Sequence, residues 1–377
     1  MKKLLLAPNS FKQCADSVKI AEMFKKYLEK GENIESISKP ISDGGDGFYE
    51  ICRKYFDTKR LTYEIPTPYD NSTISCNVAL DEKNKTAYIE SADVLGLKII
   101  PLEHHKPMFL SSKGFGELLI RLNEDIKNGR LNIEKVIIGI GGTATNDLGL
   151  GMCSQFNLEL IDIFNKNMEI LPESYYRIKK IIWSDPGLNF QINIVLDVLN
   201  PLLGKMGATR TFGLQKGLVG GEIEVLELGF TKVIHTLEKQ GVVKNEKSLF
   251  GAGGGLAAGL QIFFSAGTQS AENFILSELK LKEYINKVDF VITGEGYFDS
   301  QTLLGKGAGI ILKLFKNSVK KVFLCCGEIE KNIRSKLPEN VHPIEMIKYS
   351  KSKEDSIKNI ELGIAQAAAE IQKAINS

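Results

Sequence analysis

Histidine and cysteine are scarce in this chain, and neither occurs in the spacing of a metal site. The four histidines of the 377 residues, at positions 104, 105, 235 and 342, include no pair four residues apart, which excludes a zinc-binding helix. The six cysteines contain no C-x-x-C pair, which excludes a thioredoxin-like redox motif. We expect all six to be reduced thiols, as is typical of a cytoplasmic protein.

Charge of one sign and long apolar runs are lacking as well. Lysine and arginine number 48 against 46 aspartates and glutamates, so the net charge of +2 gives no field to attract nucleic acid or an anionic membrane. No uncharged stretch approaches the roughly 20 residues of a membrane-spanning helix. The first apolar run ends at Ala7, which is short for an export signal and is interpreted as a strand. We therefore expect neither a nucleic acid nor a membrane as a partner.

Three families of catalytic motif are missing. The chain has no Walker A motif, no kinase glycine-rich loop with H-R-D and D-F-G, and no G-x-S-x-G elbow. These absences exclude a P-loop nucleotide triphosphatase, an enzyme of the protein-kinase type and a serine hydrolase of the elbow type. Carboxylates, backbone amides and lysines remain to carry any chemistry.

Glycine and short apolar runs are abundant by contrast. Of the 35 glycines, several follow apolar runs that are typical of buried parallel strands. These runs cover residues 4–7, 136–141, 192–197, 290–295 and 322–327. Apolar stripes at helical spacing, which predict amphipathic helices, lie in residues 20–28, 115–126 and 357–375. The alternation of strands and helices predicts an α/β fold.

Residues 59–92 follow a different pattern, in which apolar and polar residues alternate between turn-forming segments. This alternation predicts antiparallel strands. An antiparallel segment inside a parallel pattern predicts that a second domain is inserted into the first. We expect a discontinuous domain of residues 1–68 plus 285–377 and an inserted domain of residues 69–284.

Four clusters stand where strands are expected to end, which is the edge at which open α/β sheets bind ligands. In the first, Asp43 and Asp46 are separated by two glycines, so a metal ion or a hydroxyl-bearing ligand can reach both acids; a tight turn with solvated aspartates is the alternative. In the third cluster, Asp197 lies at the end of an apolar run. This position suits a catalytic base, a metal ligand or a helix cap.

The second and fourth clusters combine glycines with polar residues. In residues 139–147 the backbone amides of a glycine turn can bind phosphate oxygens. The same segment contains G-x-G-x-x-A, with Glu159 about twenty residues further on, so a dinucleotide-binding dehydrogenase is an alternative prediction. In residues 289–306, Glu295 and Asp299 suit Mg²⁺, and Lys306 can offset phosphate charge.

The sequences of these clusters and their order along the chain resemble those of the type 1 glycerate kinases, which phosphorylate D-glycerate from ATP. The resemblance spans nearly the whole chain. It rests on A-P-N-S-F-K at 7–12, P-I-S-D-G-G-D-G at 40–47, I-E-S-A at 89–92, G-I-G-G-T-A-T-N-D at 139–147, D-V-L-N-P-L at 197–202, F-G-L-Q-K-G at 212–217, G-A-G-G-G at 251–255 and T-G-E-G-Y-F-D-S-Q at 293–301.

The resemblance implies two α/β domains, a discontinuous Rossmann-like parallel-sheet domain and a second α/β domain inserted into it, with a cleft between them. It also implies a kinase that uses ATP and Mg²⁺ to convert D-glycerate to 2-phosphoglycerate, with phosphorylation of the 3-hydroxyl as the alternative. The cysteines, as above, predict a cytoplasmic location. Asp197 is predicted to orient or deprotonate the glycerate hydroxyl, and Asp43 and Asp46 to bind substrate or Mg²⁺. Lys306 and the loop Gly294–Asp299 are predicted to bind the nucleotide phosphates, with Asp299 and Glu295 as metal ligands. No expectation about the oligomeric state follows.

Further residues of the matching segments are predicted to line the site. The candidate substrate-binding residues are Ser10, Lys12, Asn146, Asp147, Asn200, Gln215 and Lys216. The candidate nucleotide-binding residues are Gly141, Gly142, Gly294, Glu295, Gly296, Asp299 and Gln301.

Four positions depart from the family pattern. Asn9 replaces an aspartate, Gln13 a glycine, Leu214 a proline and Tyr297 an arginine. The loss of the arginine removes a cation, for which Lys12, Arg210 and Lys306 are candidate substitutes. A catalytically silent protein that binds glycerate or nucleotide is therefore a further alternative.

Overall fold

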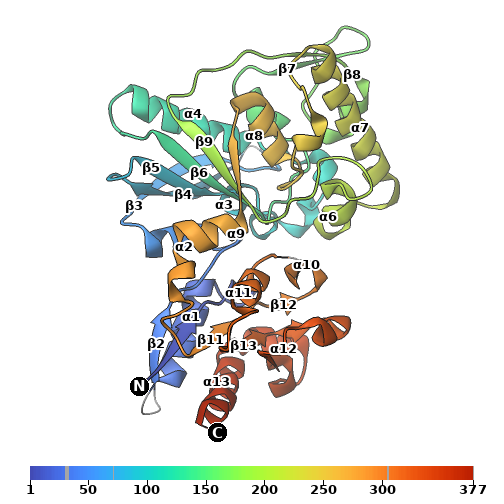
Figure 1. Ribbon diagram of the computed structural model, residues 1–377. Coiled ribbons are helices and arrows are strands. Elements are labelled where there is room, and N and C mark those ends of the chain that lie inside the picture. Colours follow the sequence, from blue (N-terminus) through green and yellow to red (C-terminus); the bar gives the residue numbers. More distant parts are fainter. Residues whose placement is uncertain (30–33, 71, 304, 377) are drawn as a thin grey trace. The chain divides into compact units, whose positions relative to one another are not determined.

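The chain divides into two compact units (Figure 1). The computed structural model describes residues 1–29, 34–70, 72–303 and 305–376. Unit 1 comprises Met1–Tyr55 and Ala271–Ser377, and unit 2 comprises Phe56–Ser270. Unit 1 is therefore discontinuous, with unit 2 inserted into it.

Both boundaries lie earlier along the chain than the positions 68/69 and 284/285 expected from the sequence. Strand β3 (Lys59–Pro66) pairs along its whole length with β4 (Thr73–Asp81), which places it in unit 2. At the second boundary, the rings of Phe274 and Phe48 are 5.2 Å apart, so the segment after residue 271 packs on unit 1. The composition of these segments does not predict the pairing of β3 with β4 or the packing of Phe274 on Phe48.

A five-stranded parallel sheet in the order β15-β13-β11-β1-β2 forms the centre of unit 1. Its strands are β1 (Lys2–Leu6), β2 (Ile34–Ser38), β11 (Phe290–Thr293), β13 (Lys321–Cys326) and β15 (Val341–Glu345). Three of the expected apolar runs are confirmed here as parallel strands. The edge strands β2 and β15 escaped prediction because polar residues and Pro343 interrupt their apolar pattern.

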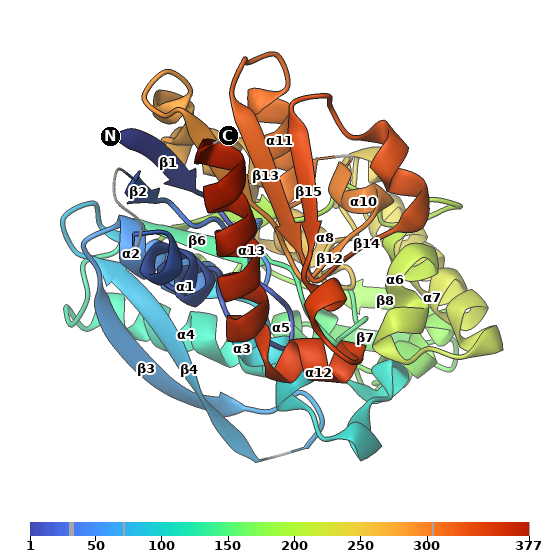
Figure 2. The same ribbon diagram turned by 90° about the horizontal axis from the view of Figure 1, so that it is seen from below.

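Helices cover both faces of this sheet, and they pack by the stripes seen in the sequence. Helices α1 (Ser17–Leu28) and α13 (Ile360–Asn376) pack on each other over one face, and α11 (Ala308–Phe315) packs on the other (Figure 2). Asp16 caps α1, because its carboxylate accepts a hydrogen bond from the Lys19 amide at 2.8 Å. The stripe at 357–375 was expected to be one helix, but α12 (Lys353–Lys358) ends before α13 begins. The remaining elements of unit 1 are α2 (Phe48–Tyr55), α9 (Ala271–Asn273), β12 (Tyr297–Phe298), α10 (Ser300–Leu303) and β14 (Glu328–Ile329).

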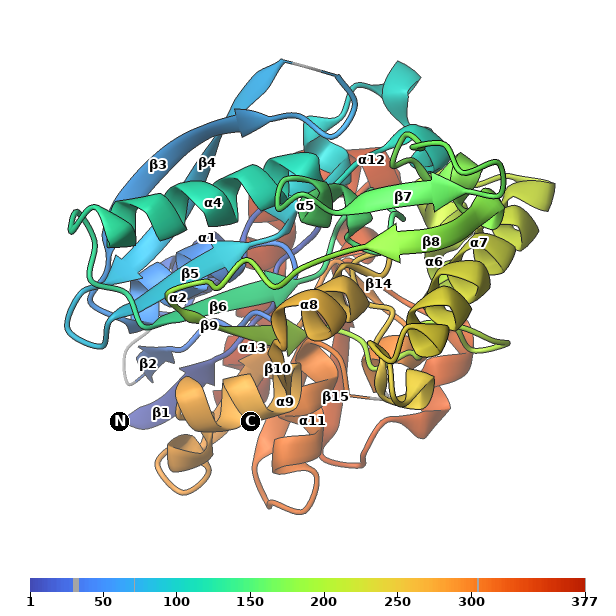
Figure 3. The ribbon, with the colours of Figure 1, turned by 90° about the horizontal axis from the view of Figure 1, so that it is seen from above.

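Unit 2 contains a six-stranded mixed sheet in the order β10-β9-β6-β5-β4-β3 (Figure 3). Strands β3, β4 and β5 (Thr86–Glu90) are antiparallel, which confirms the expectation for residues 59–92. From β5 onward the sheet is parallel, through β6 (Lys135–Ile140), β9 (Gln191–Leu196) and β10 (Gly267–Ser270). The carboxyl ends of β5, β6 and β9 therefore meet at one edge.

The helices of unit 2 enclose one large apolar core. They are α3 (Ala92–Leu95), α4 (Lys113–Lys127), α5 (Leu150–Ser154), α6 (Ala208–Lys216), α7 (Gly220–Lys239) and α8 (Leu256–Phe264). A separate hairpin of β7 (Glu159–Asp162) and β8 (Ile178–Ile182) lies beside α7. In the part of the chain that the structure describes, no helix is both long and apolar enough to cross a membrane.

Candidate functional site

The carboxyl ends of three adjacent strands bring polar side chains together in unit 1. Asn9 follows β1, Asp43 follows β2 and Glu295 follows β11. We call these three residues the unit 1 polar cluster. The Asn9 amide Nδ2 donates a hydrogen bond to Asp43 Oδ2 at 3.2 Å, and the Gly45 amide donates to Asp43 Oδ1 at 3.3 Å. Asn9 is 5% exposed and Asp43 is 7% exposed, so water is largely excluded from the pair.

A glycine makes room for this cluster at the start of α11. A Cβ atom at Gly307 would lie 2.6 Å from Asn9 Nδ2 and 3.2 Å from Glu295 Oε2, so no larger residue fits without displacing them. Gly307 also has a φ of +47°, which side chains rarely adopt. Burial raises the pKa of Glu295 to about 8, and the nearby Asp43 contributes to the rise, whereas the Thr302 hydroxyl and Lys306 oppose it.

The predicted nucleotide loop of unit 1 follows β11 directly. Gly294 is required by packing, because a Cβ there would lie 1.6 Å from the carbonyl oxygen of Cys325. Gly296 lies against the backbone of the segment that contains Lys12, with 3.3 Å from a Cβ at Gly296 to the Lys12 amide nitrogen. Asp299 accepts hydrogen bonds at Oδ1 from the Thr302 amide at 2.9 Å and the Thr302 hydroxyl at 3.3 Å.

The other predicted residues of unit 1 surround this loop less closely. Ser10 is buried, Lys12 is exposed, and Asp46, Gln301 and Lys306 are half-buried. The charge of Lys306 acts on Glu295, which places the lysine beside the cluster.

Tyr297, which replaces the family arginine, is 47% exposed on β12. The Lys353 ammonium lies over its ring, 5.6 Å from the centroid, and 3.7 Å from Glu328 Oε2. Partial burial raises the pKa of the Tyr297 hydroxyl, and the charges of Glu328, Glu330 and Asp299 add to the rise. Lys353 is therefore a cation near position 297, and it was not among the substitutes predicted from the sequence.

In unit 2, a glycine turn follows β6 and is fixed by two side chains. The Ser91 hydroxyl, which follows β5, bonds to both the amide and the carbonyl of Gly141 at 3.3 Å. Gly142 is exposed and has a φ of +68°. Asp147 is fully buried, and its carboxylate accepts from the Ser112 amide and hydroxyl at 2.6 and 2.7 Å and from the Gly149 and Gly151 amides at 3.1 and 3.2 Å. These contacts fit a positioning role for Asp147; its predicted contact with substrate stays a prediction.

Lys216 lies at the end of α6 and points its amine at this turn. Nζ donates to the Thr145 carbonyl at 2.8 Å and to the Thr143 hydroxyl at 3.2 Å. Burial lowers the pKa of Lys216 to about 7, although the charges of Asp197 and Asp147 oppose the shift. Gly254 makes the approach possible, because a Cβ there would lie 2.8 Å from Nζ and 2.6 Å from Asn146 Oδ1.

Two donors beside Lys216 are buried without a hydrogen-bond partner among the described residues. They are Asn146 Nδ2 and the Thr145 hydroxyl. Asp197, which follows β9, is half-buried and close enough for its charge to act on Lys216. Asn146, Asp197 and Lys216 are predicted from the sequence, and the structure places all three in unit 2 around the turn.

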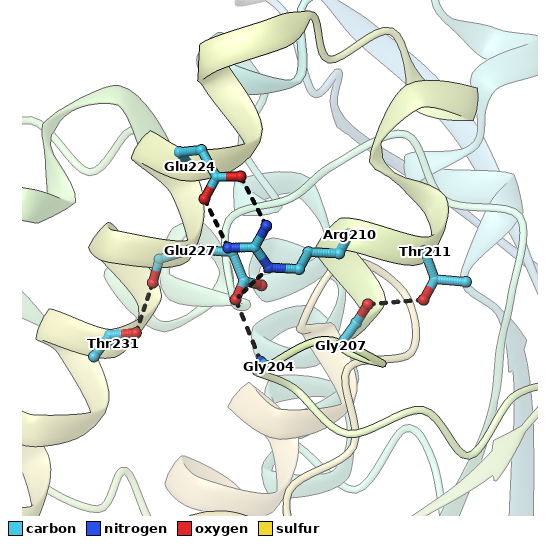
Figure 4. A network of polar contacts seen from close by, with 7 residues as sticks. All are labelled: Gly204, Gly207, Arg210, Thr211, Glu224, Glu227 and Thr231. Carbon is cyan, nitrogen blue, oxygen red and sulfur yellow. Dashed lines mark hydrogen bonds and ion pairs between the residues drawn. The ribbon is translucent and has the colours of Figure 1, made fainter.

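Three other predicted residues lie elsewhere on α6 and the preceding loop. Asn200 Nδ2 donates to the Met206 carbonyl at 2.8 Å, which closes the loop before α6, and Gln215 is exposed. Arg210 forms two hydrogen bonds of 2.7 Å to Glu224 and lies 3.4 Å from Glu227 (Figure 4). Its guanidinium is thus bound to α7, which leaves it poorly suited to replace the arginine missing at position 297.

The residues expected to hold Mg²⁺ can be tested by their donors. No group of three or more histidine, cysteine, aspartate or glutamate residues suited to a metal ion occurs in the described ranges. Mg²⁺ is commonly held by one or two carboxylates together with phosphate oxygens. Glu295 Oε1 is buried without a hydrogen-bond partner among the described residues, so Glu295 and Asp299 fit such a two-carboxylate set.

Several residues of these clusters were not singled out as site residues from sequence. Ser91, Thr145, Gly254 and Gly307 stand in or beside matching segments, but only spatial contacts give them a function. For Asn9, the available signal in the sequence was that it replaces the aspartate of the resembling family.

Two open α/β sheets whose carboxyl ends carry glycine turns, acids and amines are typical of the class of α/β proteins that bind ligands at strand ends. Comparison with known proteins identifies the family. Residues 4–376 match the glycerate kinase family, so the chain belongs to that family and is a kinase.

Individual relatives agree with this assignment. The chain is similar to a glycerate kinase of Neisseria meningitidis, with 29% identity over 99% of both chains. It is 32% identical to the glycerate 2-kinase of Escherichia coli over 88% of this chain and 86% of that one. A crystal structure of a putative glycerate kinase 2 from Salmonella typhimurium superposes with a TM-score of 0.71 at 25% identity, covering both chains completely.

Proposed function

We propose that this protein transfers the γ-phosphoryl group of ATP to D-glycerate and forms 2-phosphoglycerate, in a reaction assisted by Mg²⁺ in the cytoplasm. The observation that carries the proposal is the amine of Lys216, which donates to the Thr145 carbonyl beside a glycine turn and is near enough to Asp197 for the charge of that carboxylate to act on it. Phosphoryl transfer requires mainly positioning and charge stabilisation, and these groups provide both. The name of the E. coli relative supports the 2-position.

In unit 2, Asp197 orients the acceptor hydroxyl and takes its proton. Lys216, Thr145 and Asn146 present hydrogen-bond donors to oxygen atoms of the substrate. Asp147 holds the turn in shape through its four hydrogen bonds.

In unit 1, the loop Gly294–Asp299 and Lys306 bind the nucleotide phosphates, and Ser10 and Lys12 bind the substrate carboxylate. Glu295 and Asp299 would hold Mg²⁺, which supplies charge neutralisation at the phosphate oxygens when bound. The cytoplasmic location is supported by the six cysteines, all of which are free thiols.

Replacing Asp197 by Asn tests the role of the carboxylate. We expect turnover to fall by about 10² to 10⁴, the usual contribution of a general base, with an unchanged unfolding transition. Asp185→Asn, an exposed acid in the same unit, serves as the control. Near-normal turnover of the Asp197 variant would remove that residue from the proton transfer.

The reaction itself is tested by ADP release with D-glycerate and Mg²⁺, followed by product consumption with enolase. Direct consumption by enolase identifies 2-phosphoglycerate, and a requirement for phosphoglycerate mutase identifies the 3-isomer. Membership of the kinase family argues against the dehydrogenase that the G-x-G-x-x-A segment allowed. Ligand binding without ADP release would favour the silent binding protein instead.

A further inference from the structure

Asn9 occupies a central place in the unit 1 polar cluster, at a position where the resembling family has aspartate. Its backbone amide donates to the Gly294 carbonyl at 2.9 Å, which ties the end of β1 to the end of β11. Its side chain reaches Asp43 beyond β2. The backbone and side-chain bonds together fix the orientation of the amide group.

Within this cluster, the hydrogen bonds leave a buried acceptor of Asn9 without a partner among the described residues. Each oxygen of Asp43 accepts one hydrogen bond, from Asn9 and from Gly45. Asn9 Oδ1 is buried and has no hydrogen-bond partner among the described residues. A buried acceptor requires a donor or a cation, so the pair of Asn9 and Asp43 suits a ligand that brings a hydroxyl group or a cation.

The side-chain amide of Asn9 favours the hydroxyl group over the cation. Relative to an aspartate, Asn9 removes one negative charge and directs an N–H group at Asp43. A hydroxyl group both donates and accepts, and it can therefore pair with the carbonyl oxygen of the amide and with a carboxylate. A hard divalent cation prefers carboxylate oxygens and gains nothing from the N–H group.

We infer that Asn9 and Asp43 of the unit 1 polar cluster bind a hydroxyl group of a small hydroxy acid, and that Asn9 is the residue that makes this pair selective for a hydroxyl over a divalent cation. This inference rests on the proposed function, which supplies a substrate with two hydroxyl groups. The sequence predicts that Asp43 binds either substrate or Mg²⁺, and the inference assigns it to substrate binding.

Ligand selectivity tests the inference first. The affinities of D-glycerate, D-lactate and 3-hydroxypropanoate are measured by calorimetry without Mg²⁺; each of the last two acids lacks one hydroxyl of D-glycerate. The wild type should prefer D-glycerate to at least one of them by about tenfold or more, because the loss of a hydroxyl leaves buried partners unpaired. Asn9→Ala should reduce that preference about tenfold while the affinity for the poorer acid changes little. An unchanged preference in a folded Asn9→Ala variant would overturn the inference.

Cation binding tests the same inference independently and needs no variant to fold. Mn²⁺ is titrated by electron paramagnetic resonance into the nucleotide-free wild type, and D-glycerate is added. We expect Mn²⁺ not to compete with D-glycerate. Competition between the two would identify the pair of Asn9 and Asp43 as a cation site and overturn the inference.

Asn9→Asp restores the family carboxylate and should create the cation preference. We expect this variant to gain a Mn²⁺ site and to lose the preference for D-glycerate. Asn317→Asp, which makes the same charge change at an exposed position of unit 1, should do neither. An Asn9→Asp variant that folds and keeps both wild-type properties would count against Asn9 as the selective residue.

Failure of the inference and failure of the proposed function give different results. If the wild type releases ADP with D-glycerate but Asn9 does not affect selectivity, the inference alone fails. If no ADP is released but the Asn9-dependent preference for a hydroxy acid persists, the proposed reaction alone fails.

Discussion

At the residue scale, the proposed role of Lys216 in substrate binding predicts that the affinity for substrate depends on pH. Because burial lowers its pKa to about 7, the amine is protonated below that pH and neutral above it, so the affinity for D-glycerate should fall by up to about tenfold per pH unit above 7. The substrate carboxylate does not titrate between pH 6 and 9, so calorimetry over this range reports the protein. Lys216→Met should bind weakly at every pH, and a wild-type affinity that is flat from pH 6 to 9 would contradict the role of the amine.

The same shift has a consequence for stability. Between pH 7 and the ordinary lysine value of 10.5, the unfolded chain binds the proton that folded Lys216 has lost. The contribution of Lys216 to the free energy of unfolding therefore rises with pH across that range and is least favourable below it. The affinity and the stability thus change in opposite directions as the pH rises.

Gln13 occupies a backbone conformation that suits the glycine of the resembling family. Its φ is +66°, in a turn closed by hydrogen bonds between Phe11 and Ala15. A residue other than glycine in the left-handed region destabilises the folded state by about 1–2 kcal/mol. Glycine avoids this strain, but its greater loss of backbone entropy on folding offsets about 0.5–1 kcal/mol of the gain.

We therefore expect Gln13→Gly to raise the free energy of unfolding by about 0.5–1 kcal/mol in a urea titration. Lys12→Gly, at the neighbouring position outside the left-handed region, should lower it instead. A destabilised Gln13→Gly variant would show that the Gln13 side chain makes a compensating contact.

At the scale of elements, α6 is held to α7 by the ion pairs of Arg210 (Figure 4). Glu224 is exposed, but Glu227 is 7% exposed and also accepts from the Gly204 amide at 3.3 Å. Burial raises the pKa of Glu227, and Arg210 opposes that rise. Because α6 carries Lys216 in its last turn, these contacts also support the site.

Arg210→Met should lower the unfolding temperature more than Glu224→Gln does. Removal of the guanidinium leaves Glu227 buried without its cation, so its pKa rises further in the folded state and stability is lost as the pH increases through that value. The deficit of Arg210→Met should therefore be larger at pH 8 than at pH 5. Equal deficits at both pH values would show that Glu227 is not the group affected.

Most central elements could be predicted from sequence, because buried strands and amphipathic helices carry their periodicity locally. All five apolar runs became parallel strands, and the alternation at 59–92 became β3 to β5. The edge strand β2 and the break between α12 and α13 carry no such signal. For the site, the strand-end acids could be predicted, whereas the roles of Ser91, Gly254 and Gly307 depend on contacts between distant segments.

At the scale of the whole molecule, unit 2 is one continuous segment with its own core. The single tryptophan, Trp183, belongs to that core and packs against Phe263 at 5.1 Å. The segment 1–55, in contrast, depends on later residues, because β1 pairs with β11.

We therefore expect the fragment 56–270 to fold alone, with a cooperative urea transition in tryptophan fluorescence, and the fragment 1–55 to remain unfolded by circular dichroism. A fragment 56–270 without a cooperative transition would show that unit 2 requires unit 1.

The central claim is that this kinase places phosphate on the 2-hydroxyl of D-glycerate. Proton-coupled ³¹P spectroscopy of a mixture of the protein, ATP, Mg²⁺ and D-glycerate tests it most directly, because the splitting of the new phosphate ester signal counts the hydrogens on the esterified carbon. The account predicts the growth of a doublet, from the single hydrogen at C2, as the γ-phosphate signal disappears. A triplet, from the two hydrogens at C3, or an unchanged ATP spectrum would contradict it.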